Sequence, residues 1–190
     1  PDCHAWRNYA VRGHQHEDTG YLAEMLELPA GSEATARRAR VLTGAGNLAR
    51  SLAYYANATS YHEQALAIWR TLGNKQGVAQ SLTSLALVAD VRGDWSAAME
   101  LYKESLVLKR ELGDKRGIAT TLGNLGAMCI DQGDFATARG YAEESLTLFR
   151  QTGDRRNQAS ALNIVGELYF EQGDFVAARR HYVESAKVRQ

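Results

Sequence analysis

The stretch Asp131-Gln132-Gly133-Asp134-Phe135 contains a glycine–aspartate pair that recurs along the chain. The same pair stands at 93–94, 113–114, 153–154 and 173–174, so the pairs are evenly spaced (113 − 93 = 20), and Gly-Asn occupies 73–74 one step earlier. Glycine adopts the left-handed conformation that ends a helix, and aspartate or asparagine caps the next helix. The pattern therefore predicts helices of about 18 residues, each about five turns long, joined by short reversals.

The composition is that of an ordinary folded protein. The chain has 190 residues, of which 45% are hydrophobic and 23% are charged. Lys plus Arg and Asp plus Glu both number 22, so the formal net charge is zero, whereas nucleic-acid-binding domains usually carry a basic excess. No apolar run approaches the ~20 residues of a membrane-spanning helix. We therefore predict neither a nucleic-acid nor a membrane partner for this segment.

Cysteine usage and the chain ends suggest where the protein works. Cys3 and Cys129 lack the close spacing of a metal site or a redox motif, and so few cysteines are typical of a reducing compartment. We therefore predict a cytoplasmic location. The chain starts at Pro1 without a methionine and stops inside a predicted helix. We interpret it as a fragment of a longer chain whose array of repeats continues.

Two regions differ in regularity. Residues 1–31 are predicted to form a degenerate N-terminal helical hairpin, broken by Pro29. From residue 32 the chain divides into repeats that each span two of the intervals between junctions, namely 32–71, 72–111, 112–151 and an incomplete 152–190. The first repeat has Ala53-Tyr54 where a glycine–aspartate pair is expected, so its internal turn is less tightly specified.

Alignment of the four repeats shows rows of equivalent residues that predict the core. Small residues, which let two helices approach closely, occupy two rows: Ala58, Ala98, Ala138 and Ala178, and Gly46, Ala86, Gly126 and Gly166. Leucine occupies a third row (Leu42, Leu82, Leu122 and Leu162) and a fourth that weakens in the last repeat (Leu66, Leu106, Leu146 and Ala186). Aromatic residues follow the turns and are expected to fill the wedge there (Tyr55, Trp95, Phe135 and Phe175). One hairpin cannot bury its own apolar face, so the repeats must stack.

These rows resemble the tetratricopeptide repeat, whose signature has Leu-Gly, a Tyr three residues later, and then Ala and an aromatic residue in the second helix. The fourth repeat carries it best, with Gly166, Tyr169, Ala178 and Tyr182. The resemblance implies an all-α, right-handed superhelical solenoid of stacked antiparallel helix pairs. The 40-residue repeats are longer than the usual ~34. In that respect they are similar to those of bacterial multidomain signal-transduction ATPases and transcriptional regulators, although no ATPase residue is present here.

Several motifs suggest chemistry but have better structural explanations. The segment His14-Gln15-His16-Glu17-Asp18 lacks the fixed geometry of a metal site, and Gly44 to Ala49 matches a dinucleotide fingerprint without the strand that must precede it. No catalytic triad or phosphate-binding loop is visible, so we predict no enzyme, no cofactor and no metal. Cations after the junctions, at Lys75, 115–116 and 155–156, favour helix-end stabilisation over an anionic ligand.

The first helix of each repeat offers the candidate binding surface, because its remaining positions vary between repeats while the core rows do not. In tetratricopeptide arrays these positions line a concave groove. The predicted groove residues are Arg40, Thr43, Asn47 and Arg50; Gln80, Thr83, Leu87 and Asp90; Thr120, Gly123, Ala127, Ile130 and Asp131, with Asn124 beside them; and Ser160, Asn163, Glu167, Phe170 and Glu171. The set runs from basic to acidic. Asn124 could hydrogen-bond the backbone of an extended peptide.

The resulting functional hypothesis is a protein-interaction or sensing module within a larger bacterial regulator. It would bind a peptide segment or effector in the groove, and its partners would be proteins or peptides, other domains of the parent chain included. The alternative is a structural spacer or an oligomerisation arm without a groove ligand, which would self-associate through the open ends of the array.

Overall fold

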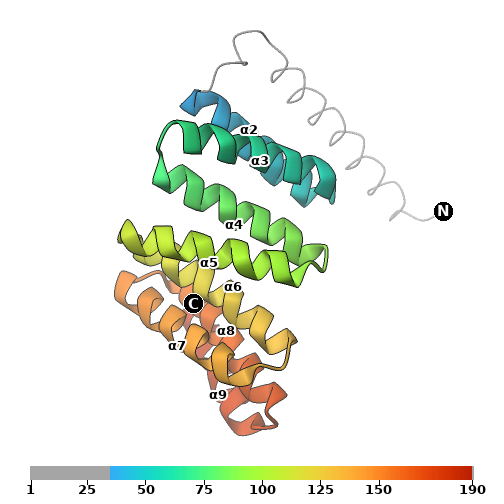
Figure 1. The fold of residues 1–190 in the computed structure, drawn as a ribbon. Helices are drawn as coiled ribbons and strands as arrows, with labels where there is room; N and C mark the ends of the chain where they lie inside the picture. Colours follow the sequence, from blue (N-terminus) through green and yellow to red (C-terminus); the bar gives the residue numbers. More distant parts are fainter. Residues whose placement is uncertain (1–34, 190) are drawn as a thin grey trace, which may run out of the picture. The chain divides into compact units, whose positions relative to one another are not determined.

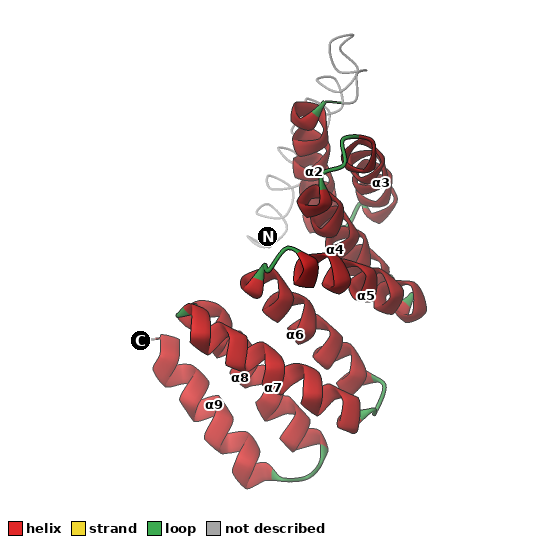
Figure 2. Cartoon of the chain, turned by 60° about the vertical axis from the view of Figure 1, so that its left-hand side comes forward, coloured by secondary structure: helices red, strands yellow, loops and turns green. Residues whose placement is uncertain are grey.

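The computed structural model describes residues 35–189, and throughout this range the chain is helical apart from short turns (Figures 1 and 2). The helices follow one another in four pairs: α2 (Ala36–Ser51) and α3 (Tyr55–Thr71), α4 (Lys75–Val91) and α5 (Trp95–Glu111), α6 (Lys115–Asp131) and α7 (Phe135–Thr152), and α8 (Arg155–Glu171) and α9 (Phe175–Arg189). The predicted breaks near 93, 113, 133, 153 and 173 are confirmed. The predicted hairpin at 1–31 lies outside the described residues.

The helix junctions form as the recurring pair predicts. Gly133 has a φ of +75°, and its N–H donates to the carbonyl of Ile130 while the N–H of Asp134 donates to the carbonyl of Cys129, both at 2.9 Å. The Asp134 carboxylate then accepts from the N–H of Thr137 at 3.1 Å, which caps α7. The same positive φ occurs at Gly73, Gly93, Gly113, Gly153 and Gly173. One residue pair thus satisfies the free carbonyls of one helix and a free N–H of the next.

The turn at Ala53 and Tyr54 has the same backbone hydrogen bonds with less suitable residues. Ala53 takes a φ of +61° and is the only described non-glycine residue with a positive φ. Tyr54 is the N-cap of α3, and its side chain makes no capping hydrogen bond. A Cβ atom is strained in this conformation by roughly 1–2 kcal/mol. The neighbouring helices therefore impose the turn on this segment.

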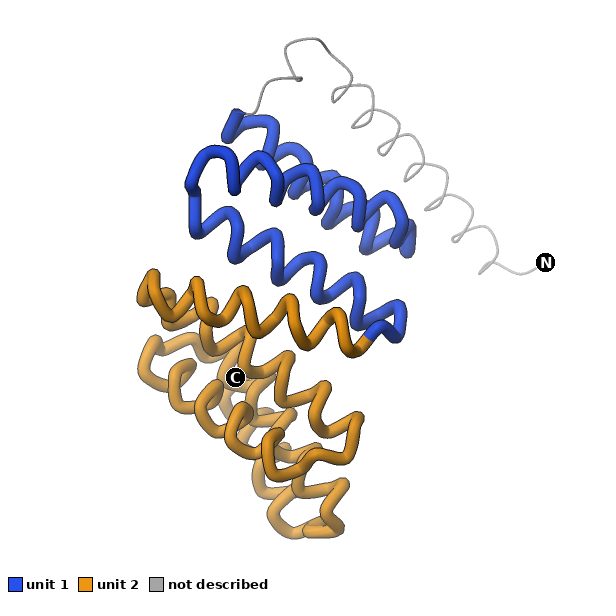
Figure 3. The backbone as a smooth tube through the Cα atoms, viewed as in Figure 1, with its two compact units in different colours: residues 1–94 blue, residues 95–190 orange. Residues whose placement is uncertain are grey.

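Two compact units divide the chain, Pro1–Asp94 and Trp95–Gln190 (Figure 3). In unit 1, α3 packs against both α2 and α4. In unit 2, α6 packs against α7, α7 against α8, and α8 against α9. In each unit a second helix is thus covered by the first helix of the following repeat. Together with the paired helices, this arrangement is that of an all-α solenoid.

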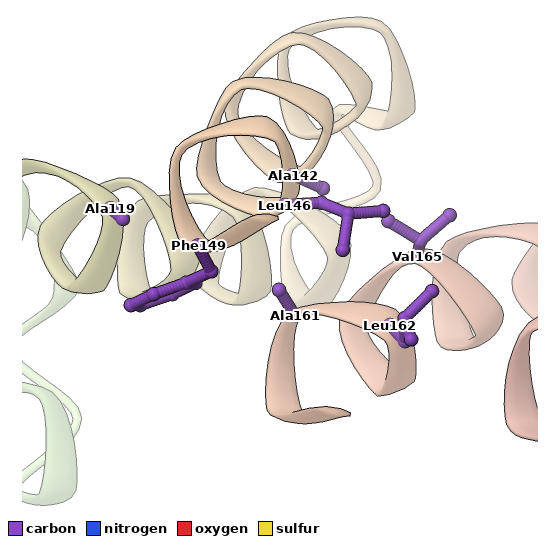
Figure 4. Packing of buried hydrophobic residues seen from close by; sticks show 7 residues of the cluster. All are labelled: Ala119, Ala142, Leu146, Phe149, Ala161, Leu162 and Val165. Carbon is purple, nitrogen blue, oxygen red and sulfur yellow. The ribbon is translucent and has the colours of Figure 1, made fainter. Parts of the chain in front are cut away.

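The core of unit 2 is built from the predicted rows. Leu146 of α7 and Leu162 of α8 belong to one buried cluster with Ala142, Phe149 and Val165, which Figure 4 shows meeting between the helices. Leu162 is completely buried and Leu146 is 6% exposed. A buried leucine contributes roughly 1.5–3 kcal/mol relative to an exposed one, so these rows supply the stacking energy.

The small-residue row allows close approach of paired helices, as predicted. A Cβ added to Gly166 would lie 2.9 Å from the Tyr182 ring, and one added to Gly46 would lie 2.5 Å from the His62 ring. Real Cβ atoms do not approach so closely, so the glycines make room for rings carried by the second helices. The predicted aromatic row behaves less uniformly. Phe135 is half-buried against the core, whereas Phe175 is 62% exposed, so the prediction that it fills a wedge is wrong.

The two kinds of junction generate a matched prediction. Ala53→Gly should raise the free energy of unfolding by about 1 kcal/mol, because it removes the strain of a left-handed alanine. Gly133→Ala should lower it by a similar amount, and purely through the backbone, since no atom lies within 4 Å of the added Cβ. Urea denaturation followed by circular dichroism measures both changes. A loss of stability in Ala53→Gly would contradict this account of the turn.

Candidate functional site

In unit 1, the predicted groove residues lie on α2 and α4, which contact each other. The exposed members are Arg40, Asn47 and Gln80, and the partly buried members are Thr43, Arg50, Thr83, Leu87 and Asp90. The hydroxyl of Thr43 donates to the carbonyl of Ala39 at 2.8 Å, and that of Thr83 donates to the carbonyl of Ala79 at 3.0 Å. Both threonines thus use their hydroxyl protons in hydrogen bonds within their own helices.

Arg50 is the most unusual side chain of this surface. It is partly buried near the end of α2, and its Nε atom is buried without a hydrogen-bond acceptor among the described residues. Buried donors in native proteins nearly always have partners. The guanidinium is therefore partly dehydrated and available to an acceptor from outside the described chain.

In unit 2, the predicted residues lie on α6 and α8, which also contact each other. An ion pair joins these helices, because Arg116 Nε lies 2.7 Å from Asp154 Oδ2. The predicted members Thr120, Asp131, Ser160, Glu167, Phe170 and Glu171 are exposed, and Asn124, Ala127 and Asn163 are partly buried. Each unit thus carries its own candidate surface.

Three predicted residues of unit 2 need comment. Ile130 is only 6% exposed and packs in a core cluster with Cys129, Ala138 and Leu168, so its assignment to the groove is wrong. Gly123 is buried as well, 3.4 Å from Ile164 and Ser145 as measured from an added Cβ. Asn124 donates from Nδ2 to the Tyr102 hydroxyl at 3.2 Å, which occupies part of its hydrogen-bonding capacity.

Carboxylates gather at the end of the unit 2 surface. Burial raises the pKa of Glu167, and the charges of Asp131 on α6 and Glu171 on α8 raise it further. Burial and the charges of Glu167 and Glu171 also raise the pKa of the Tyr182 hydroxyl. The three carboxylates therefore repel one another, and a bound cationic group would relieve that repulsion.

Sequence reasoning did not predict that His62 and Lys109 are buried titratable side chains. His62 has no exposed surface, and neither ring nitrogen has a described partner. Burial and then the charge of Arg50 lower its pKa from 6.5 to about 4. Lys109 is 7% exposed and donates from Nζ to Thr121 Oγ1 at 2.7 Å. Burial lowers its pKa to about 8, against the opposing charge of Asp114. The alignment of the repeats indicates that Lys109 is buried, because the equivalent residues are the apolar Trp69 and Phe149.

The other chemical motifs do not develop into sites. The segment from Gly44 to Ala49 lies inside α2 with no preceding strand in the described chain. Arg116 is paired with Asp154, and Arg155 Nε donates to the Val188 carbonyl at 3.2 Å, which supports a stabilising role for these cations.

Within residues 35–189 no group of three metal-ligating side chains occurs. The predicted cluster at 14–18 lies outside the described residues. No helix in the described range has the length and apolarity to span a bilayer.

Solved structures with the same architecture come from several sources. The chain is similar to BtubC (BKLC) from P. vanneervenii, with a TM-score of 0.79 and 20% identity over 95% of this chain and 75% of that one. It is also similar to a putative kinesin light chain from Podosopora anserina, with a TM-score of 0.74 and 14% identity over 96% and 90% of the two chains. A Rap protein complexed with Competence and Sporulation Factor has a TM-score of 0.76 and 18% identity, over 94% of this chain and 52% of that one. None of the curated protein sequences matches the chain.

The paired helices and the repeating core define the class of α-solenoid repeat proteins. The model of the tetratricopeptide repeat family matches residues 33–111 and 117–190, and the chain belongs to this family. The resemblance inferred from the repeat rows is therefore confirmed. A solenoid of this family supports a role in protein–protein interaction.

His62 generates a prediction for the pH dependence of stability. Its pKa falls from 6.5 in the unfolded chain to about 4 in the folded protein, so only the unfolded state binds a proton between these values. The contribution of neutral His62 to the free energy of unfolding should therefore be complete above pH 6.5. It should decrease as the pH falls towards 4.

The variant His62→Tyr isolates this contribution, because the fourth repeat accommodates a tyrosine, Tyr182, against the equivalent glycine. As the pH is lowered through this window, the decrease measured by urea denaturation should be smaller in the variant than in the wild type. The capping hydrogen bonds lower the pKa values of Asp134 and Asp154, so these groups titrate below the window. Equal decreases in both proteins would rule out a neutral buried His62.

Proposed function

We propose that this chain is a non-enzymatic interaction module that binds a peptide segment on the surface formed by the first helices of its repeats. The observation that carries this proposal is Arg50, a half-buried guanidinium whose Nε has no described acceptor on the predicted surface. An unpaired buried donor costs about 1–3 kcal/mol, and a carboxylate of a bound peptide would satisfy it with a charge-assisted hydrogen bond.

The charges of the two surfaces suggest what each would accept. On the α2 surface, Arg40 and Arg50 have no ion-pair partner in the described chain, so an acidic segment would bind there. On the α6 and α8 surface, the mutual repulsion of Asp131, Glu167 and Glu171 favours a basic segment. An acidic peptide segment is therefore the expected ligand of the α2 surface, and a basic segment is the expected ligand of the α6 and α8 surface.

The setting of the module is also a proposal. The long repeats are similar to those of bacterial multidomain regulators, and a Rap protein with the same fold is complexed with Competence and Sporulation Factor. We infer that this chain acts in the cytoplasm as the sensing part of such a regulator. The alternative is a structural spacer or an oligomerisation arm without a groove ligand.

The proposal can be tested by selecting peptides from a phage-displayed random library on the wild-type chain and measuring their affinities by isothermal titration calorimetry. Arg50→Glu should weaken the binding of peptides with an acidic segment by about tenfold or more, which corresponds to about 1.4 kcal/mol of binding free energy. Glu167→Arg should do the same for peptides with a basic segment. Glu167 is exposed and Arg50 is only partly buried, so neither change should reduce the helical circular dichroism signal.

The matched control is Glu63→Arg, an exposed position on the second helix of the first repeat. It alters charge to the same extent as Glu167→Arg and should leave affinity unchanged. If no peptide is enriched, or if enriched peptides bind Arg50→Glu and Glu167→Arg as tightly as the wild type, the first-helix surfaces are not the binding site.

A further inference from the structure

The layer between α2 and α3, which lie side by side in unit 1 (Figure 1), holds two buried polar groups without partners among the described residues. His62 has no exposed surface, and neither of its ring nitrogens has a hydrogen-bond partner. A Cβ added to Gly46 would lie 2.7 Å from His62 Nε2, so the imidazole packs against α2. Arg50 follows Gly46 by one turn on the same face of α2 (50 − 46 = 4), and its Nε is also buried without an acceptor. The imidazole and the guanidinium are therefore neighbours in one poorly hydrated layer.

The row of residues equivalent to His62 lies directly beneath the first-helix surface in other repeats as well. Tyr102 occupies this row in the second repeat, and its hydroxyl accepts from Nδ2 of Asn124, beside the predicted groove residues, at 3.2 Å. Tyr182 occupies it in the fourth repeat, and the charges of Glu167 and Glu171 raise the pKa of its hydroxyl. A ring in this row thus responds to charges on the first-helix surface.

For His62 that charge comes from one side chain. Its helix α3 packs against α2 and α4. Burial is the larger cause of its lowered pKa, and Arg50 is the only charged group of the described chain that contributes to the shift. The other charged side chains of these three helices are Arg37, Arg38 and Arg40 on α2, Glu63 and Arg70 on α3, and Lys75 and Asp90 on α4. A change in the charge at Arg50 therefore changes the proton affinity of His62 without compensation from a second group.

We propose that an acidic segment bound at Arg50 and a proton bound at His62 promote each other, so that this surface binds its ligand more tightly under mildly acidic conditions. The inference rests on the proposed binding of an acidic segment at Arg50 and adds its regulation. A ligand carboxylate beside the guanidinium offsets the positive charge that disfavours the imidazolium. By linkage, the proton must then strengthen the binding of the carboxylate by the same factor.

The direction of the effect follows from the pKa of His62. In the free protein this pKa is about 4, so the imidazole is neutral in mildly acidic solution. A bound anion raises it, and the complex takes up protons as the pH falls below the ordinary value of 6.5. Because burial still opposes the charged form, we expect a modest gain, with a dissociation constant about twofold or more smaller at about pH 5 than at about pH 7.5.

The first experiment uses acidic peptides enriched by phage selection on the wild-type chain. Calorimetry should show the twofold gain in the wild type and its loss in His62→Tyr, whose ring has the space that Tyr182 uses in the fourth repeat. At about pH 5, titrations in two buffers with different ionisation enthalpies should show greater proton uptake by the wild type than by His62→Tyr. Basic peptides that bind the α6 and α8 surface are the control, and their pH dependence should be the same in both proteins.

A second experiment needs no ligand. Arg50→Gln removes the charge that a bound carboxylate would offset, so it should raise the pH at which the His62 imidazole titrates. Heteronuclear NMR measures this titration, with the signal assigned by its loss in His62→Tyr. The matched control is Arg40→Gln, an exposed arginine of the same helix that does not contribute to the shift. It should leave the titration unchanged.

An unchanged His62 titration in Arg50→Gln would overturn the inference. So would an acidic peptide that Arg50→Glu weakens but whose affinity has the same pH dependence in the wild type and in His62→Tyr. In that second case the proposed function stands and only the coupling fails. If no acidic peptide is enriched, the proposed function itself fails, and the regulation of its ligand fails with it.

Discussion

The structure depends on a reversal of the backbone in which a left-handed glycine is followed by a capping carboxylate. A helix can end abruptly only if its last carbonyls find donors, and the next can start at once only if its first N–H groups find acceptors. The junction at 133–134 meets both requirements within two residues. Because such junctions recur at a constant interval, all described helices have nearly the same length, and equivalent side chains return to equivalent places. The turn at Ala53 shows that packing can impose this geometry where the local sequence does not favour it.

Regular spacing makes the exceptions informative. Most buried side chains are leucine or alanine, but His62 and Lys109 place titratable groups at buried positions. Each is buried at the expense of its charged form, which accounts for the lowered pKa of both side chains. The two buried side chains differ in their hydrogen-bond partners. Lys109 donates to a neighbouring hydroxyl, whereas His62 has no described partner. Of the two, His62 makes the first repeat the more sensitive to acid.

Binding surfaces arise in this fold wherever the stacking pattern leaves a face uncovered. The first helices of each unit present polar side chains between their core rows, whereas the second helices use apolar side chains to pack against the next repeat, as α7 does against α8. The first-helix surfaces offer separated charges and suit an extended peptide.

The sequence alone determined the helix boundaries, the pairing and the core rows, because these follow from local rules of termination, capping and periodicity that regular repetition makes easy to see. It also determined which positions of the first helices vary, and most of these are at least partly exposed. Only the tertiary structure decided that Ile130 belongs to the core, that Asn124 bonds Tyr102, and that Phe175 is exposed. These outcomes depend on how helices distant in sequence meet. Which face of α6 is buried, and how much of a phenylalanine on α9 stays exposed, is set by side-chain packing between helices rather than by the sequence near each residue.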